Sequence, residues 1–454
     1  MGRRSKTKRL GVWMNGERVG TWSVLSSGIH EFRYDRKWLE YPEVRPLSLS
    51  MPVNDAKLAY TGEVVEAFFE NLLPDSADIR RRLQRRFSVE KNSAFDLLAE
   101  IGRDCVGAIQ LLPDGETPLE TRTISAQPLD EAGVARALRQ AVASPGFGQP
   151  FDDNFRISIA GAQEKTALLW HEGRWCIPSG ATPSSHIFKL PLGLVGSMQA
   201  NMKESVENEW LCAQIVKAYG LPIARCERAD FEDQHVLVVE RFDRRLSSDG
   251  TWWIRLPQED MCQATGTPPG AKYENEGGPG IIRIMELLLG SRDALADRRN
   301  FLKAQVLYWI LAAPDGHAKN FSIFLEPQSR FSLAPLYDVI SAYPILGHGI
   351  NKIAPQKLTM AMSVVGKTRH NKWEHITAGR WRSTASKCRA RGEIEGIFQE
   401  LIDATPKAVE SVSSALPNDF PITVSEPILE GIQTAVERLR SGISAPLTKE
   451  PWEP

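Results

Sequence analysis

The stretch APDGHAKNF (313–321) places four polar side chains directly after a long apolar segment. Pro314 disfavours helical geometry at Ala313, so the apolar segment is predicted to end there as a helix and to present Asp315 on a loop. Asp315 and Asn320 have the spacing of the base Asp and the metal-binding Asn in a protein-kinase catalytic loop. This D-x-x-x-x-N spacing is weak on its own, but it points to phosphoryl transfer.

A second carboxylate follows at the end of a predicted hairpin. FSIFLEP and RFSLAPLYDV, within 321–339, are expected to return the chain to the loop and to bring Asp338 there. Asp315, Asn320 and Asp338 then offer two carboxylates and an amide oxygen, which are ligands that suit Mg²⁺. The alternative is that each aspartate only caps a turn.

Earlier residues fit the same chemistry. Lys189 lies in an apolar predicted strand, HIFKLP, where its ammonium needs an anion such as a nucleotide phosphate or a helix glutamate. An exposed lysine on an edge strand is the alternative. Glu207 and Glu209, on the helix expected at 203–219, are candidate partners for such a lysine, although we expect both at the surface.

Two segments have the features of a nucleotide-binding lobe. VVERF (238–242) ends an apolar strand, as a hinge that hydrogen-bonds adenine would, although an edge strand without a ligand explains it equally well. The loop IAGAQEK (159–165) has a single glycine and therefore lacks the G-x-G-x-x-G pattern, yet backbone N–H groups of a tight turn can still bind phosphate.

The elements around these residues predict an α+β protein. Alternating apolar runs joined by Asn15-Gly16 indicate an N-terminal hairpin, and helical periods follow over 63–87, the second helix being rich in arginine. A proline-rich linker with one short helix near 129–143 precedes strands at about 154–190 and 235–245. Helical periods dominate after about residue 280. The predicted layout is a β-rich lobe followed by a helical lobe.

Composition excludes several classes of protein. The 454 residues carry 55 Lys+Arg and 56 Asp+Glu, so any nucleic-acid-binding surface must be local. VLYWILAA (306–313) is too short to cross a bilayer, and the basic start lacks the apolar stretch of a secretory signal. We therefore expect a cytoplasmic protein without a membrane partner, whose six widely spaced cysteines are free thiols.

Several blocks, taken in order, resemble the HipA family, the toxin kinases of bacterial type II toxin–antitoxin pairs. They run from about residue 10 to residue 440. The resemblance implies a small β-rich N-terminal domain with helices and an atypical two-lobed protein-kinase-like domain with a helical C-terminal lobe. The expected boundaries are 1–112, a linker at 113–153, a small lobe at 154–245 and a large lobe at 246–454. The blocks are WMNGERVG, RPLSLSMP, FFENLLPDS, FDLLAEIGRDCVGA, RISIAGAQEKTALL, HIFKLP, VERFDRR, LPQEDMCQ, KYENEGGPGI, DGHAKNFS and LYDVISAYP.

The same resemblance implies roles for individual residues. Asp315 would be the catalytic base, Asn320 and Asp338 the Mg²⁺ ligands, and Ser158 a site of self-phosphorylation that inactivates the enzyme. Pro314 departs from the family's usual residue before the base. ATP would be contacted by Ala160, Gly161, Ala162, Gln163, Glu164, Lys165, Lys189, Glu240, Arg241, Phe242, His317, Ala318, Lys319, Asn320, Tyr337 and Asp338.

The family also implies partners. The substrate would be a serine of glutamyl-tRNA synthetase, whose phosphorylation arrests growth and causes persistence. The antitoxin would be a HipB-like helix-turn-helix dimer, with which the chain represses its operon at the nucleoid. A strip at 367–391 holds eight Lys/Arg and one acidic residue, and Lys387 and Arg389 are its candidate DNA contacts. A solvated basic face is the alternative for the strip, and a small-molecule kinase or a catalytically idle corepressor for the whole protein.

Overall fold

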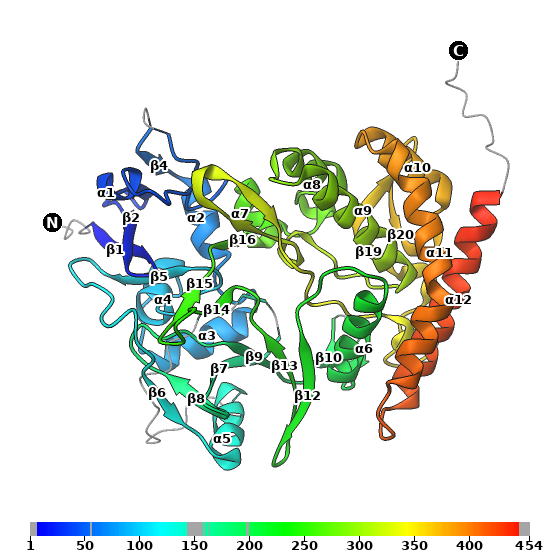
Figure 1. Ribbon diagram of the computed structural model, residues 1–454, viewed down its shortest axis with the longest axis horizontal. Helices are drawn as coiled ribbons and strands as arrows, with labels where there is room; N and C mark the ends of the chain where they lie inside the picture. Colours follow the sequence, from blue (N-terminus) through cyan, green and yellow to red (C-terminus); the bar gives the residue numbers. More distant parts are fainter. Residues whose placement is uncertain are drawn as a thin grey trace. The chain divides into compact units, whose positions relative to one another are not determined.

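A computed structural model describes residues 7–54, 57–142, 158, 160–161, 163–196 and 199–444. The chain forms two compact units (Figure 1). Unit 1 contains 1–190, 226–272 and 322–334, and unit 2 contains 191–225, 273–321 and 335–454. Each unit is thus assembled from separate pieces of chain, and each is described here by itself.

The first sheet of unit 1 begins with the predicted hairpin. Asn15 and Gly16 both have positive φ, at 48° and 90°, as the tight turn between β1 and β2 requires. Helices α2 and α4 bury an aromatic cluster, in which Trp22 of β2 stacks on Phe69 with ring centroids 3.8 Å apart. The strand order is β4-β3-β2-β1-β5. The elements are β1 (Lys8–Met14), β2 (Glu17–Val24), β3 (His30–Tyr34), α1 (Arg36–Leu39), β4 (Ala59–Thr61), α2 (Glu63–Glu70), α3 (Ala77–Arg86), α4 (Ala94–Ile101) and β5 (Ile109–Pro113).

A six-stranded sheet with the order β12-β13-β9-β7-β8-β6 makes up the second layer of unit 1. Val134 and Leu138 of α5 pack against Phe188 and Val236 of this sheet. Every described pairing in this sheet is antiparallel. The elements are β6 (Ala126–Pro128), α5 (Glu131–Val142), β7 (Lys165–His171), β8 (Arg174–Pro178), β9 (His186–Lys189), β12 (Cys226–Phe231) and β13 (Gln234–Glu240).

Smaller pairings complete unit 1. Strands β14 (Arg244–Leu246) and β15 (Trp253–Arg255) form one hairpin. Strand β17 (Ser322–Leu325) lies between β16 (Gln258–Asp260) and β18 (Phe331–Leu333). Helix α7 (Met261–Thr265) begins at Asp260, whose side chain forms a capping box with Gln263.

A fully buried ion cluster lies within unit 1. Asp104 contacts Arg241, Arg244 and Arg255 at 3.0 to 3.3 Å, and Asp243 contacts Arg241 and Arg244 at 2.9 Å. Burial would raise the pKa of Asp104, but the three arginines together hold it well below its usual range. The cluster joins the segment after α4 to the chain around β14 and β15.

Unit 2 is built around α9 (Ala294–Ile310), whose second half, from Phe301 onward, is buried on all sides. It packs against α8 (Ile281–Leu287), α11 (Arg391–Ser414) and α12 (Ile422–Ser444). The long helices α11 and α12 lie side by side (Figure 1). The remaining elements are β10 (Gly193–Val195), β11 (Ala200–Met202), α6 (Ser205–Ala218), β19 (Thr359–Val365), β20 (Arg369–Lys372) and α10 (Ala378–Lys387).

The predicted α+β class, the N-terminal hairpin, the hairpin over 321–339 and the long helices are confirmed, whereas one alternative is excluded and one expectation is corrected. Lys189 does not lie on an edge, because β9 is flanked by β7 and β13. Glu207 and Glu209 are buried and not at the surface. The hairpin expected over 321–339 is present as β17 and β18, and its ladder ends at Leu333.

Two further findings concern the whole chain. In the part of the chain described, no helix is both long and apolar enough to cross a membrane. The six cysteines are free, and all but the half-buried Cys226 are buried. The first strand expected after residue 154 falls largely outside the described residues, and the domain boundaries stay a prediction.

Candidate active site

The loop that carries Asp315 starts from a specific helix end. Helix α9 closes with a Schellman motif, in which the amide of Ala313 donates to the carbonyl of Tyr308 at 2.8 Å. Ala312 holds the left-handed position of this motif, with φ 46°. Helix α9 therefore ends at Ile310, and Pro314 follows its cap, where a proline cannot continue the helix.

The carbonyls at the end of α9 are capped by the segment that follows Asp338. The Tyr343 hydroxyl donates to the carbonyl of Ile310 at 2.8 Å, and the Ser341 hydroxyl donates to that of Leu311 at 2.6 Å. Asn208 of α6 in turn holds Ser341 through two backbone hydrogen bonds of 2.8 Å. These bonds fix the chain on both sides of the candidate catalytic loop.

Asp315 and Asn320 are brought together as predicted. The side-chain nitrogen Nδ2 of Asn320 donates to the backbone carbonyl of Asp315 at 2.7 Å. His317 lies between them in the chain, and its amide also donates to the Asp315 carbonyl, at 2.8 Å. Because the Asn320 nitrogen is occupied by a carbonyl, the oxygen of the same side chain is the end that remains to face a cation.

Asp338 has a left-handed backbone, with φ 59°. Non-glycine residues adopt this conformation at an energetic cost and are found in it at functional sites. The buried hydroxyl of Tyr308 has its pKa raised, first by loss of solvation and then by the negative charge of Asp338. Among the described residues, the Tyr308 hydroxyl has no hydrogen-bond partner.

This donor set fits Mg²⁺. The side chains of Asn320 and Asp338 supply oxygen ligands, and Mg²⁺ usually keeps several waters and substrate phosphates as its other ligands. A polar hydroxyl left without a protein partner is compatible with a hydrated ion. No cluster of three or more His, Cys, Asp or Glu side chains suited to a metal occurs among the residues described, so a closed all-protein metal cage is absent from them.

The structure adds a residue to this cluster that the sequence did not indicate. Tyr273 donates a hydrogen bond from its hydroxyl to the Asp315 carboxylate. Its ring also meets the His317 ring edge-on, with centroids 5.1 Å apart and an interplanar angle of 86°. KYENEGGPGI stood out as a block, but no spacing rule links Tyr273 to an aspartate so far along the chain.

Other predicted residues of this part of the site are also placed in unit 2. His317, Ala318, Lys319 and Asn320 are buried. The Tyr337 hydroxyl donates to the carbonyl of Lys319 at 2.7 Å, which joins the two predicted segments.

The predicted phosphate loop and Lys189 belong to unit 1. Residues Ala160, Gly161, Gln163, Glu164 and Lys165 are described, whereas Ala162 lies outside the described residues. The amide of Asp75 donates to the Gly161 carbonyl at 3.0 Å, and Arg82 of α3 pairs with Glu164. The N-terminal part of unit 1 therefore holds the loop at two points.

Ser158, just before this loop, is fully buried. Its hydroxyl donates to the carbonyl of Leu72 at 2.8 Å, and its amide donates to that of Asp104 at 3.1 Å. Nothing in the sequence indicates either partner.

Lys165 and Lys189 are directly opposite each other on neighbouring strands β7 and β9. The Lys165 ammonium donates to the carbonyl of Ala160 at 2.5 Å, and the Lys189 side chain is buried. Like charges in opposing positions destabilise a sheet. The strand register therefore sets two lysines at one position of the β7–β9 pair.

The predicted hinge residues Glu240, Arg241 and Phe242 have different surroundings. Glu240 is exposed and Phe242 meets the Phe324 ring edge-on. The Arg241 guanidinium belongs to the buried ion cluster, with bonds to Asp104, Ser184 and Asp243. The Arg241 backbone is also engaged, because its N–H donates to the Ser185 carbonyl at 2.9 Å and its carbonyl accepts from the Arg244 amide at 3.1 Å.

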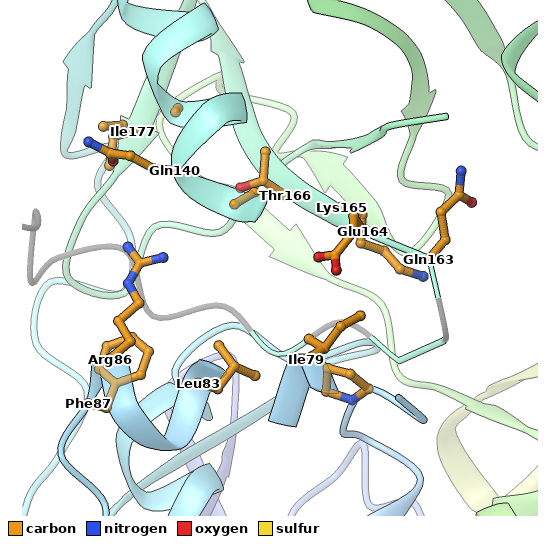
Figure 2. A pocket seen from close by; sticks show the side chains of 13 residues that line it. Ile79, Leu83, Arg86, Phe87, Gln140, Gln163, Glu164, Lys165, Thr166 and Ile177 are labelled. Atoms are coloured by element: carbon orange, nitrogen blue, oxygen red, sulfur yellow. The ribbon is translucent and has the colours of Figure 1, made fainter. Parts of the chain in front are cut away.

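A pocket opens beside the phosphate loop, and Figure 2 shows Gln163, Glu164 and Lys165 near it, with Ile79 and Leu83 of α3 on another side. Residues of α5, β7 and β8, together with Pro74, Arg86 and Phe87, complete its lining. Of the predicted nucleotide contacts that the structure describes, Gln163, Glu164 and Lys165 line this pocket, whereas Lys189 and the hinge residues do not.

Some basic residues of the strip at 367–391 form ion pairs, and others are exposed to solvent. Arg369 pairs with Glu274 at 3.2 Å, and Arg382 forms a bidentate pair with Glu395. Lys387 and Arg389 are exposed.

Comparisons with known proteins agree with this architecture. The models of two families match the chain, the HipA N-terminal domain over residues 10–112 and the HipA-like C-terminal domain over residues 157–409. A Sinorhizobium fredii protein named "Putative kinase Y4mE" is 34% identical over 360 residues, which cover 78% of this chain and 82% of that protein. The serine/threonine-protein kinase toxin HipA of Shewanella oneidensis is 27% identical over 65% of this chain and 66% of its own length.

A solved structure shares the fold. The complex of Shewanella oneidensis HipA, HipB and operator DNA contains a chain that matches with a TM-score of 0.76 and 22% identity, covering 96% of this chain and 98% of that one. The predicted architecture, an N-terminal β domain followed by a kinase-like domain, is thereby confirmed. The model of the HipA-like C-terminal domain matches more than half of the length of this chain, and this chain therefore belongs to the HipA family.

Proposed function

We propose that this protein is an ATP- and Mg²⁺-dependent kinase that transfers the γ-phosphate to serine or threonine hydroxyls. The observation that carries the proposal is the arrangement of Asp315, Asn320 and the segment of Asp338 around the end of α9. In it a carboxylate, an amide oxygen and a strained aspartate occupy the chain positions expected of a kinase loop. Membership of a family whose named relatives are kinases supports the same activity.

Each residue has a role in this proposal. Asp315 accepts the proton of the attacking hydroxyl, and Asn320 and Asp338 hold the metal. The bound ion neutralises charge on the nucleotide phosphates. Lys189 and the 160–165 loop bind those phosphates, and the strand register that sets Lys165 opposite Lys189 supports an anionic ligand there.

The test is γ-phosphate transfer by the full chain with labelled Mg-ATP. Asp315→Ala and Asp338→Ala should each abolish transfer without loss of fold, because neither side chain is part of the core. Asp403→Ala is a matched control, since Asp403 is an exposed aspartate of α11 in the same unit. Transfer by Asp315→Ala within a few-fold of the parent would remove the base assignment.

We further propose a toxin role with a protein substrate, a serine of glutamyl-tRNA synthetase. The support is family-level, from the relative named as a toxin kinase. Incubation of the synthetase with the protein and Mg-ATP should phosphorylate one serine and stop aminoacylation, whereas Asp315→Ala should do neither. Phosphorylation of a different protein in a cell extract, with the synthetase untouched, would reject this substrate.

The proposed partner is a HipB-like helix-turn-helix antitoxin dimer bound to operator DNA. A related chain has been solved in a complex of that composition, and the exposed Lys387 and Arg389 could neutralise phosphates. An upstream gene for a small helix-turn-helix protein, and co-purification with its product, are the expected observations. The idle-corepressor alternative requires DNA binding without phosphoryl transfer, so the same assays separate the two.

Phosphorylation of Ser158 would switch the enzyme off. Its buried hydroxyl is a hydrogen-bond donor to Leu72, and a phosphate there adds nearly two negative charges beside a carbonyl oxygen. The residue could not return to its present place, so the adjoining loop would lose its anchor. Mass spectrometry after incubation with Mg-ATP should find phosphate on Ser158 in the parent and none in Asp315→Ala. A fully active phosphorylated form would refute the switch.

A further inference from the structure

We propose that Tyr273 is a positioning residue for phosphoryl transfer, because its hydroxyl orients the Asp315 carboxylate. The proposal rests on the proposed function, since it takes Asp315 as the base. Among the described residues, the only side-chain hydrogen bond to this carboxylate comes from Tyr273. The other carboxylate oxygen lies 4.0 Å from the His317 ring nitrogen, beyond hydrogen-bond range.

The Asp315 carboxylate needs such support. Its side chain is 54% exposed, and the terminal torsion of an aspartate is broad, so packing alone does not select one orientation. A base must present one oxygen to the acceptor hydroxyl within hydrogen-bond distance. A hydroxyl bound to Oδ1 fixes the carboxylate plane and leaves Oδ2 for the acceptor.

Tyr273 is itself rigidly held within unit 2. Its carbonyl accepts backbone N–H bonds from Glu276 and Gly278, each of 3.0 Å. The next residue, Glu274, accepts the amide of Ser363 at 2.6 Å and pairs with Arg369. A Cβ on Gly280 would lie 2.2 Å from the Glu274 carboxyl carbon, so only glycine fits beside this anchor.

The Asp315 side of the contact is equally constrained. A Cβ on Gly316 would lie 2.6 Å from the Tyr308 ring, which keeps the loop tight against the end of α9. The edge-on packing of the Tyr273 ring on the buried His317 ring sets the height of the hydroxyl above the loop. Two rigid supports therefore meet at one hydrogen bond.

The test compares Tyr273→Phe with Tyr219→Phe in the full chain. Tyr273→Phe keeps the ring and removes only the hydroxyl. Tyr219 is a matched control, because its buried hydroxyl bonds Thr405 in the same unit at 2.7 Å and takes no part in the candidate site. The measured quantities are the maximal rate of γ-phosphate transfer from labelled Mg-ATP to the chain and to water, the half-saturating Mg-ATP concentration, and the melting temperature.

For Tyr273→Phe we expect the maximal rate to fall on the order of 10- to 100-fold, as misplacement of a reacting group does, with half-saturation and melting temperature unchanged. Tyr219→Phe should show the opposite pattern, a lower melting temperature at an unchanged rate. A Tyr273→Phe rate within twofold of the parent would overturn the proposal. A faster rate would also overturn it, because the hydroxyl would then be blocking the acceptor's place.

The Asp315→Ala variant separates this proposal from the proposed function. If Asp315→Ala still transfers phosphate, the base assignment fails and the role of Tyr273 fails with it. If Asp315→Ala is inactive and Tyr273→Phe is fully active, the kinase assignment stands and only the positioning role is lost.

Discussion

Replacing Asp104 by Asn should destabilise unit 1 strongly. The carboxylate contacts three buried arginines, and its loss leaves Asp243 alone to balance them. Removing one partner from a buried ion pair typically costs about 3–5 kcal/mol, because the remaining charges are left uncompensated in a medium that solvates them poorly. The Asn amide keeps the size of the side chain, so the loss is electrostatic and creates no cavity.

Urea unfolding at pH 7, followed by circular dichroism, measures this effect. With a denaturant slope of about 3 kcal/mol per molar, the midpoint should fall by roughly 1 M or more. Asp78→Asn is the control, because its pair with Arg81 lies at the surface of α3 and should leave the midpoint unchanged.

The difference between Asp104→Asn and the parent should also depend on pH in one direction. The pKa of Asp104 is lowered in the folded state, so its stabilising effect is fully present above the ordinary aspartate value of 3.8 and is lost as the pH falls through the folded value. The two proteins should therefore converge in strong acid. A midpoint for Asp104→Asn equal to that of the parent at pH 7 would refute the reasoning.

Three further perturbations test other parts of the molecule. Lys189→Met should weaken Mg-ATP binding by tenfold or more with the fold intact, and unchanged affinity in calorimetry would remove this lysine from the site. Lys387→Glu combined with Arg389→Glu should weaken the antitoxin–operator complex and lower the magnitude of its salt slope by about 2 while transfer continues, and an unaltered slope would return the strip to ordinary solvated surface. Glu259 is fully buried, and burial raises its pKa from 4.5 to about 8. The parent should therefore lose stability as the pH rises from about 5 to 8, whereas Glu259→Gln should not. Urea midpoints of the two proteins that run parallel across this pH range would contradict this expectation.

The sequence predicts the catalytic loop well because the signals there are local. Asp315 and Asn320 lie on one short loop, and their spacing carries the chemistry. Tyr273 could not be found in this way, because its contact with Asp315 depends on how distant parts of unit 2 pack. The buried cluster around Asp104 could not be predicted from the sequence for the same reason, because its arginines come from a later part of the chain.

Burial was the other property that periodicity did not predict. An apolar strand with one lysine has the same sequence pattern at the edge and in the centre of a sheet. Only the strand order shows that Lys189 lies on a central strand. The same limit applies to Glu207 and Glu209, whose burial depends on what covers α6. The left-handed Ala312 shows a third limit, because Pro314 predicts that the helix ends but does not predict which non-glycine residue takes the left-handed position.

Each unit is assembled from separate pieces that alternate along the chain, and this order affects both translation and the outcome of truncating mutations. Strand β17, which pairs with β16, and strand β18, which pairs with β17, are translated only after residues 191–225 and 273–321 of unit 2. Domains generally fold as units as they emerge, but unit 1 is incomplete until Ala334 has been translated. Any stop codon or frameshift before that point removes pieces of both units at once. Early truncations should therefore yield unfolded products that proteases clear, with neither unit surviving as a separate fragment.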